Sequence, residues 1–272
     1  RWSKPIPFDS QRQWGPEPKY PHVLAVPKTK PKKPLIIAGP CSVESEKQLC
    51  QIAKVLAKNH VDYMRGGIYR AGTYPPDEGF GFNLAKAIWL SRIASDHGLK
   101  IVMEPLDHNR ASDLWPYADA FQVGARQMQN YAMLAKYAEC GKTIFLKRNM
   151  GATLDEFLGA AEYLARKNAD VVLVERGSST YHNHVRWDIS ISLIAAVKKL
   201  TGIPILIDAS HGTGRRDLVL PMIKAGIAAG ADGYLIEVHP NPDESISDAE
   251  QAYPLKDFPK LVKEVQKIWD AR

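Results

Sequence analysis

Cysteine is scarce in this chain, with three among 272 residues, at positions 41, 50 and 140. An odd and low number excludes a disulfide framework and is typical of proteins in a reducing cytosol. Long apolar runs are also lacking, because the longest have the length of a strand rather than of a membrane span. No signal peptide is recognisable. We therefore expect a cytoplasmic protein that does not enter a membrane.

Two further absences narrow the range of functions. No G-x-G-x-x-G follows the first predicted strand, so nothing supports a dinucleotide-binding fold. The formal net charge is +6, but the basic residues are spread along the chain instead of forming one stripe. This distribution argues against a nucleic-acid partner. It agrees equally with an ordinary basic surface and with arginines gathered for small anionic substrates.

Residues 1–34 have the composition of an N-terminal arm and linker rather than of a domain. They contain eight of the 19 prolines. One short strand is expected at residues 22–26, followed by a lysine-rich linker. We expect this arm to cap the fold or to meet a neighbouring subunit, and residues 35–272 to form the domain.

From residue 35 onward, short apolar segments alternate with longer helical ones. The predicted strands cover residues 35–38, 62–65, 100–104, 120–123, 143–147, 170–175, 203–208 and 233–237. The predicted helices cover residues 46–59, 83–97, 109–114, 128–139, 154–167, 189–200, 215–229 and 259–271. The strands do not alternate strictly between apolar and polar residues, which is typical of burial on both faces. Eight such units predict a TIM (β/α)8 barrel, with a doubly wound open sheet as the alternative.

The segment 203–217, IPILIDASHGTGRRD, indicates where the chemistry of such a barrel lies. A buried strand there ends in a polar turn that carries Asp208 and His211. Every other predicted strand also ends at or near charged or metal-binding residues. The C-terminal ends of parallel strands meet on one face of a barrel, and active sites are found on that face. The sequence therefore predicts one polar site at the barrel mouth.

A metal site is predicted where the eighth strand closes against the first. Neighbouring strands lie about 5 Å apart, so three adjacent tips bring together His211, Glu237 and Cys41. A fourth ligand is expected among the acids of the following loop, which are Asp243, Glu244 and Asp248. One thiolate, one imidazole and carboxylates suit a divalent first-row ion: Mn, Fe, Co or Zn. Such scattered ligands favour a catalytic ion over a structural zinc site.

Cations gather at the tips of the remaining strands. They are Arg65, Arg70, Arg126, Lys147, Arg148 and Arg176. Arginine forks match the oxygens of carboxylates and phosphates in bidentate fashion. The set predicts a substrate with more than one negative charge. The alternative for any single member is that it points outward and pairs with Glu104, Asp107 or Glu175.

These stretches resemble the 3-deoxy-D-arabino-heptulosonate 7-phosphate (DAHP) synthase family, in its short microbial subclass without a regulatory domain. The matching motifs span nearly all of residues 35–253: IIAGPCSVES, RGGIYRAGTYP, QVGARQMQN, FLKRNMGAT, VLVERG, IDASHGTGRRDLV, ADGYLIEVHPNP and SDAEQ. The resemblance implies a TIM barrel that condenses phosphoenolpyruvate with erythrose 4-phosphate and releases phosphate. This reaction opens the shikimate pathway toward the aromatic amino acids. We also expect a homo-oligomer, a dimer or a tetramer.

The resemblance also implies roles for individual residues. The metal ligands are Cys41, His211, Glu237 and Asp248. Arg126 and Arg176 bind the phosphate of phosphoenolpyruvate. Arg65 and Lys147 bind its carboxylate, and Asp208 faces the sugar phosphate. Either Lys147 or a metal-bound water is expected to move protons. The expected catalytic residues are Lys147, His211 and Cys41.

One motif departs from the family pattern. The family usually has Lys-Pro-Arg-Thr where this chain has Arg70-Ala71-Gly72-Thr73. The arginine that binds the aldose phosphate is thus replaced by Gly72. The candidates for this contact are Arg70 and Thr73, with another cation, including one from a partner subunit, as the alternative. The sequence GSSTYHNH after Arg176 also departs from the usual pattern.

Two other functions remain as alternatives. The first is 3-deoxy-D-manno-octulosonate 8-phosphate synthase, which uses arabinose 5-phosphate on the same barrel. The second is a basic barrel that binds a partner without catalysis. The complete set of candidate metal ligands argues against the second, because a protein without catalysis needs no open metal site.

Overall fold

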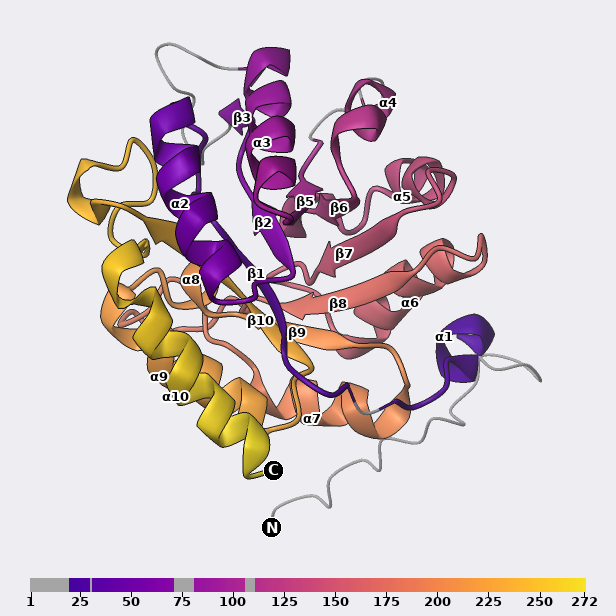
Figure 1. The fold of residues 1–272 in the computed structure, drawn as a ribbon. Coiled ribbons are helices and arrows are strands. Elements are labelled where there is room, and N and C mark those ends of the chain that lie inside the picture. The colour runs from indigo at the N-terminus through magenta and orange to yellow at the C-terminus, as the bar shows by residue number, and fades with distance from the viewer. Residues whose placement is uncertain (1–19, 30, 71–80, 106–110) are drawn as a thin grey trace.

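A closed parallel sheet forms the centre of the protein in the computed structural model, which describes residues 20–29, 31–70, 81–105 and 111–272 (Figure 1). Eight strands follow one another around the ring. They are β1 (Leu35–Gly39), β2 (Tyr63–Arg65), β5 (Lys100–Met103), β6 (Ala120–Val123), β7 (Thr143–Lys147), β8 (Val171–Glu175), β9 (Ile205–Asp208) and β10 (Gly233–His239). Pairing of β1 with β10 closes the ring, from Leu35 opposite Gly233 to Gly39 opposite Glu237. The predicted TIM barrel is confirmed, and the open sheet is excluded.

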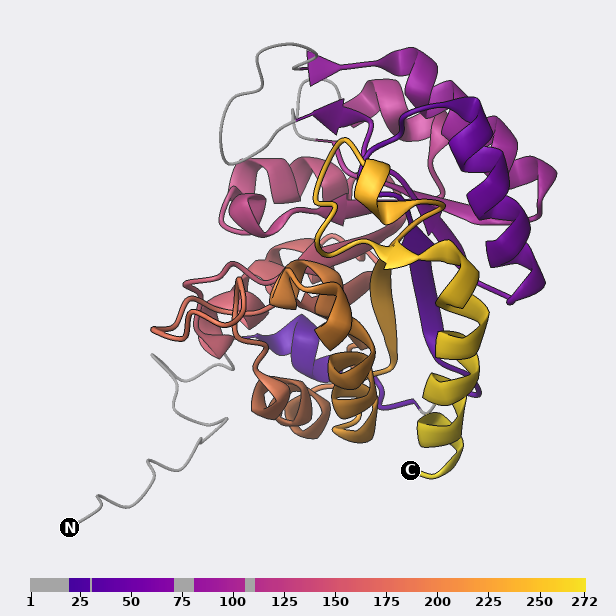
Figure 2. The ribbon, with the colours of Figure 1, turned by 90° about the vertical axis from the view of Figure 1, so that its left-hand side faces the viewer.

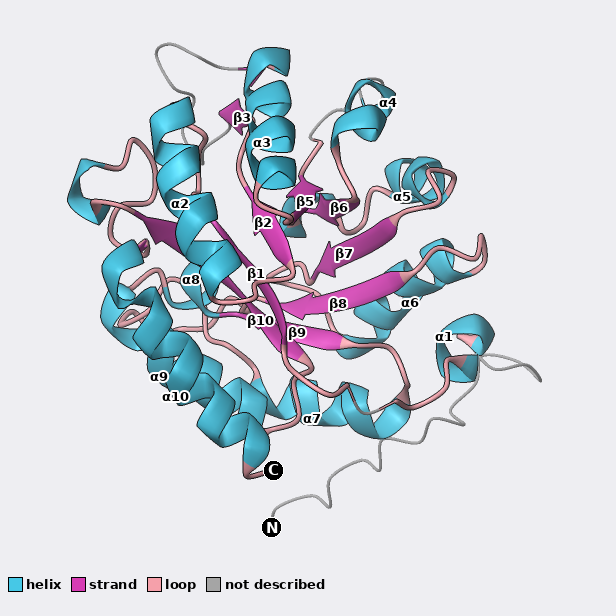
Figure 3. Ribbon diagram, in the orientation of Figure 1, coloured by secondary structure: helices cyan, strands magenta, loops and turns pink. Residues whose placement is uncertain are grey.

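Helices surround this ring, as Figure 3 shows. The main ones are α2 (Glu46–Lys58), α3 (Leu84–Asp96), α4 (Ala111–Leu114), α5 (Tyr131–Ala138), α6 (Leu154–Ala165), α7 (Ile191–Leu200), α9 (Arg216–Ala228) and α10 (Phe258–Asp270). A short antiparallel ribbon, β3 (Tyr69–Arg70) with β4 (Gly81–Phe82), follows β2. The two-residue strand β11 (Tyr253–Pro254) extends beside β10. Among the described residues, no helix has both the length and the apolar character needed to cross a membrane.

The strands are buried on both faces because they separate two apolar layers. A small inner group fills the barrel: Ile37, Val102, Ala120, Phe145, Val172, Val174, Leu206 and Leu235. Their neighbours along the strands, such as Ile36 and Ile207, belong to the larger layer between strands and helices. Successive side chains of a strand point to opposite faces. Each strand therefore has one row of side chains that point into the barrel and one row that points toward the helices. Only the inward row can place side chains at the barrel mouth.

The N-terminal segment differs from the prediction. The expected strand at residues 22–26 is wrong, because helix α1 (Pro21–Ala25) occupies this position. Proline is favoured in the first helical turn, where its missing N–H is not needed. The carboxylate of Glu162 in α6 accepts the N–H of Val23 at 3.0 Å, and Val23 is fully buried. Residues 1–19 lie outside the described part of the chain, so most of the predicted arm stays a prediction.

The polar turn predicted after β9 is also more regular than expected. Residues Ala209–Thr213 form the short helix α8. Asp208 caps it by accepting the N–H of His211, and Gly214 ends it in the left-handed conformation at φ 65°. Glycine adopts this conformation without steric cost. The short helix turns His211 back over the end of the barrel.

Candidate metal centre and anion site

The candidate site residues continue the inward-pointing rows of the strands and therefore lie together at the C-terminal end of the barrel. Leu206 and Leu235 line the barrel interior, and two residues further on lie Asp208 and Glu237. The same step leads from other inward residues to Arg65, Glu104, Gln122, Lys147 and Arg176. Polar side chains that would be costly inside the apolar barrel thus emerge at its C-terminal end. In Figure 2, β1 and β10 run side by side toward the segment that follows β10.

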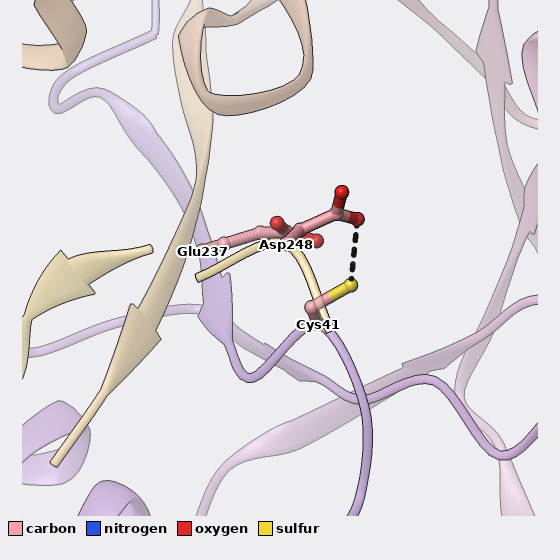
Figure 4. A group of neighbouring side chains, drawn as sticks. All are labelled: Cys41, Glu237 and Asp248. Atoms are coloured by element: carbon pink, nitrogen blue, oxygen red, sulfur yellow. Dashed lines mark hydrogen bonds between the residues drawn. The ribbon is translucent and has the colours of Figure 1, made fainter. Parts of the chain in front are cut away.

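Three of the predicted metal ligands form a tight group. The ligand atoms of Cys41, Glu237 and Asp248 all lie within 4.8 Å of one another (Figure 4). The thiol of Cys41 donates to Asp248 Oδ2 at 3.2 Å. His211 joins through its Nε2, which is 3.1 Å from Glu237 Oε1. Residues from the ends of β1, β9 and β10 and from a later loop therefore meet, as the sequence predicted.

The loop that carries Asp248 is anchored on the segment after β1. Ser247 donates its hydroxyl to Ser42 at 2.8 Å, and the N–H of Ile246 donates to Glu44 at 3.1 Å. Asp248 itself has a φ of 48°, which is uncommon for a residue other than glycine. Such strained positions are found where the surrounding structure requires a defined side-chain direction. Of the three acids left open as the fourth ligand, Asp248 lies at the site, whereas Asp243 pairs with Arg216.

A line of buried charges continues from this group. Lys147 Nζ lies 2.8 Å from Asp208 Oδ2, and His211 Nδ1 lies 2.8 Å from the same oxygen. Burial alone would raise the pKa of Asp208, but the charges of His211 and Lys147 hold it well below its ordinary value. Asp208 was expected to face the sugar phosphate. Its carboxylate is fully buried and engaged between Lys147 and His211, and a phosphate contact stays a prediction.

Glu237 is held ionised from three sides. Arg65 donates to Oε1 at 2.5 Å, and Gln251 donates to Oε2 at 2.5 Å. Burial would raise the pKa of Glu237, but the charges of His211 and Arg65 lower it far below its ordinary value. Burial would likewise lower the pKa of His211, yet the carboxylates of Asp208 and Glu237 raise it. The carboxylates that attract a proton to this imidazole would equally attract a metal cation.

The donor set fits a transition-metal ion better than Mg²⁺ or Ca²⁺. It offers one sulfur, one imidazole nitrogen and carboxylate oxygens, whereas Mg²⁺ and Ca²⁺ prefer oxygen ligands alone. Burial and the charges of Glu237 and Asp248 raise the pKa of the Cys41 thiol well above its ordinary value, with Arg65 opposing them. Metal ligation requires the thiolate, so a bound cation would reverse this shift.

An electropositive region lies beside the metal group. Arg176 is buried, and its Nη1 has no hydrogen-bond partner among the described residues. Burial lowers the pKa of Arg176, and the nearby charges of Arg126 and Arg186 lower it further against the opposing effect of Asp208. The ring of Trp187 covers this guanidinium, with its centroid 5.4 Å from Cζ. An anion would satisfy the unpaired donor and offset the repulsion between the cations.

Arg148 does not belong to this set, which corrects the predicted cation cluster. Its Nη2 donates to Glu175 Oε1 at 2.8 Å, and Nε donates to the other oxygen. Glu175 also accepts the N–H groups of Gly177 and Ser190. Phe145 and Val174 face inward, so the residues three and one positions later face outward. The pair therefore anchors the β8–α7 loop, as the alternative of outward pairing anticipated.

Some predicted site residues lie outside the described part. They are Thr73 and Asp107, and for Arg70 only the backbone, in β3, is described. The replacement at Gly72 also falls within this gap. The contact to the aldose phosphate therefore stays a prediction.

A sequence profile of the DAHP synthetase I family matches residues 19–271. The chain belongs to this family. The resemblance predicted from the motifs is thereby confirmed, and with it the assignment to a family of enzymes.

The phospho-2-dehydro-3-deoxyheptonate aldolase of Thermotoga maritima is 40% identical over 239 residues, covering 87% of this chain and 70% of the relative. The fold is similar to its crystal structure, with a TM-score of 0.83 at 38% identity over 88% of this chain and 69% of that one. A truncated form of that DAHP synthase gives a TM-score of 0.80 and covers 87% of both chains. The 2-dehydro-3-deoxyphosphooctonate aldolase of Bradyrhizobium diazoefficiens is more distant, with 27% identity over 84% of this chain and 86% of the relative.

Two residues at the centre were missed by the sequence reasoning. Gln251, which is fully buried, holds Glu237, and Arg186 holds both Gln251 and Asp248. Gln251 belongs to the SDAEQ motif, so its position three residues after Asp248 was a usable signal. Arg186 lies two residues beyond the GSSTYHNH sequence that departs from the family pattern, and only its position in the structure reveals it.

Proposed function

We propose that this chain catalyses the metal-dependent condensation of phosphoenolpyruvate with erythrose 4-phosphate, giving DAHP and phosphate. The observation that carries the proposal is the meeting of two features at one barrel mouth. A Cys–His–Glu–Asp group with the chemistry of a transition-metal site lies beside the buried Arg176, which has one donor without a partner among the described residues. Membership in the DAHP synthetase I family supports the same reaction. In this reaction C3 of phosphoenolpyruvate bonds to the aldehyde carbon, water adds at C2, and phosphate leaves.

The cations of the mouth are proposed to fix phosphoenolpyruvate. Arg176 and Arg126 would take the phosphate, because Arg176 has a buried donor to satisfy and a second arginine close by. Arg65 and Lys147 would take the carboxylate from the barrel side. Both are buried, and each already contacts a carboxylate, Arg65 that of Glu237 and Lys147 that of Asp208. Fixing the substrate in this way supplies proximity and orientation.

The metal ligands are proposed to be Cys41, His211, Glu237 and Asp248, and the ion Mn, Fe, Co or Zn. Such an ion, when bound, supplies Lewis acidity toward a carbonyl oxygen or activates a water. Asp208 accepts from Nδ1 of His211 and so directs Nε2 toward the ligand group. Lys147, 2.8 Å from Asp208 and 3.5 Å from His211, is placed to move protons between substrate and protein.

The aldose phosphate is proposed to lie against Arg70 and Thr73, in place of the arginine that Gly72 replaces. A buried charged contact contributes about a hundredfold in affinity. The variant Arg70→Ala would then raise the Michaelis constant for erythrose 4-phosphate by about this factor. An unchanged constant would show that another residue holds this phosphate.

The test of the function is phosphate release from phosphoenolpyruvate with each of two aldoses. We expect release with erythrose 4-phosphate, loss of release after treatment with a chelator, and recovery when Mn²⁺ is added. Arabinose 5-phosphate is the matched competitor, because a relative named 2-dehydro-3-deoxyphosphooctonate aldolase is also similar in sequence, at 27% identity. Faster turnover with arabinose 5-phosphate would show that this aldose, and not erythrose 4-phosphate, is the substrate. Phosphate release that continues after chelation would show that the reaction does not need the metal.

We also propose a cytoplasmic location and a homo-oligomer, a dimer or a tetramer. The three cysteines are free, as expected in a reducing compartment. Light scattering of the purified protein would give the number of subunits, and a monomer at working concentration would contradict the second part.

A further inference from the structure

The loop between β8 and α7 returns to the barrel mouth through residues 186–188. The N–H of Arg186 donates to Thr213 at 2.9 Å, and that of Trp187 donates to Gly212 at 2.8 Å. Asp188 and Ser178 exchange backbone hydrogen bonds at 3.0 and 2.9 Å across the base of the loop. The segment is thus tied on one side to β8 and on the other to the helix that carries His211.

Three glycines make room for this segment. A Cβ at Gly214 would lie 2.9 Å from the Cβ of Arg186, and one at Gly177 would lie 2.5 Å from the Cβ of Trp187. A Cβ at Gly212 would meet Ile189 at 2.5 Å. A Cβ this close to the Cβ of Arg186 or Trp187 would push the segment away, so Gly177 and Gly214 are required by the close approach, whereas the end of the Ile189 side chain could move. The glycines just after β8 and at the end of α8 therefore allow the segment to pass close to the mouth.

The side chain of Arg186 reaches two ligand-holding groups from this position. Its Nη2 donates to Asp248 Oδ1 at 3.1 Å, and its Nη1 donates to Gln251 Oε1 at 2.9 Å. Gln251 in turn donates to Glu237 Oε2. The second oxygen of Asp248 is then the one that faces Cys41. One guanidinium fork thus fixes the rotation of the Asp248 carboxylate directly and that of Glu237 through Gln251.

We propose that Arg186 is a positioning residue of the metal centre, which orients Asp248 and Glu237 without itself being a ligand. This inference rests on the proposed metal site. Partners that hydrogen-bond to metal ligands contribute about tenfold to a hundredfold in metal affinity. The planar fork of arginine suits this task because it spans two acceptors at once.

The direction in which the metal affinity changes when Arg186 is removed distinguishes a positioning role from a purely electrostatic one. Arg186 carries a positive charge close to a site for a cation, so its removal reduces repulsion and would tighten metal binding. Loss of a positioning contact acts in the opposite direction, because Asp248 and Gln251 are then free to turn away. Weaker binding in the absence of Arg186 therefore cannot arise from the charge alone.

The experiment measures the dissociation constant of Mn²⁺ by calorimetry on metal-stripped protein, without substrate. We expect Arg186→Ala to raise it about tenfold to a hundredfold. Arg215→Ala is the matched control, since this exposed arginine of the neighbouring turn pairs with Asp217. It should bind Mn²⁺ like the wild type. Wild-type or tighter affinity in Arg186→Ala would overturn the inference.

Co²⁺ provides a second readout, because its bond to a thiolate gives a charge-transfer band in the near ultraviolet. Arg186→Ala should show this band at saturating Co²⁺, while Cys41→Ser should lack it. Wild-type protein that binds neither ion would overturn the metal site and this inference together. If Arg186→Ala does not fold, Arg186→Met keeps the stem that packs on Gly214, and wild-type affinity in that variant would overturn the inference.

Discussion

The two ends of the barrel use carboxylates in different ways. At the N-terminal end, an aspartate directly precedes every second strand of the ring, at positions 62, 119, 170 and 232. Three of these accept the backbone N–H of the preceding strand, and Asp170 accepts the Thr143 hydroxyl. At the C-terminal end, Glu237 and Asp248 are held by side chains of distant segments. The carboxylates at the N-terminal end thus connect neighbouring strands, whereas Glu237 and Asp248 are oriented by side chains at the barrel mouth.

The largest effect is expected at the ligand end. Cys41→Ser removes the thiolate from the group of four, and we expect loss of metal binding and of turnover. The free energy of unfolding should stay near that of the wild type, because Cys41 lies at the mouth and not in the apolar core. Metal analysis, phosphate release and chemical denaturation measure the three quantities. Full activity of metal-stripped Cys41→Ser would contradict the proposed ligand.

The next effect is expected at the anion site. Arg176→Ala removes a buried guanidinium, one donor of which has no partner in the described part of the chain. We expect the Michaelis constant for phosphoenolpyruvate to rise about a hundredfold, with a much smaller change for the aldose. Arg176→Lys keeps the charge but lacks the forked guanidinium, so its Michaelis constant for phosphoenolpyruvate should lie between those of the wild type and Arg176→Ala. Steady-state kinetics with each substrate varied in turn decides this. Equal changes for both substrates would place Arg176 outside the phosphoenolpyruvate site.

A carboxylate of the opposite end should affect stability alone. Asp232 accepts the N–H of Ile205 at 2.9 Å and pairs with Lys198 at 2.8 Å. Asp232→Ala leaves this buried N–H unpaired, which costs about 1–3 kcal/mol of unfolding free energy. Asp232→Asn retains an acceptor and should cost less. Urea denaturation gives the free energies, and both Michaelis constants should match the wild type. A changed constant would show that the two ends are coupled.

The smallest effect is expected at Glu162, which fixes helix α1 from outside the barrel. Burial alone would raise the pKa of Glu162, but hydrogen bonds from the N–H of Val23 and from His22 hold it below its ordinary value. A lowered pKa in the folded state stabilises the protein above the unfolded pKa, and this contribution is lost as pH falls through the folded value. Between about pH 6 and about pH 3, wild type should lose more stability than Glu162→Gln. If the stability of the wild type and of Glu162→Gln changed equally with pH, Glu162 would not contribute to the loss of stability in acid.

Much of the barrel was predictable because its local patterns are strong. Strands β6 and β7 have the predicted bounds, since their apolar runs end in a turn or a charged pair. The apolar run HVLAV was misassigned because a short apolar stretch suits a strand or a helix equally. Its helical form depends on Glu162, about 140 residues away, which accepts the first N–H groups.

Part of the site could also have been predicted more sharply. Counting in steps of two from Phe145 places Lys147 inside and Arg148 outside, so the alternation of a strand separates the two neighbours. On the neighbouring strand β8, Val174 points inward, so the next residue, Glu175, points outward and pairs with Arg148. Arg186 could not be found in this way, because no regular element sets the direction of its side chain.

The sequence by itself determined the eight strand–helix units, the types of residue at their ends and the family to which the chain belongs. These follow from local periodicity and from motifs that need no knowledge of distance. Only the tertiary structure decided which charges meet. Ring closure between β1 and β10 brings Cys41 to Glu237, and the loops that follow β8 and β10 add Arg186 and Asp248. Their pairing depends on distances and directions in space, which no local pattern of residues encodes.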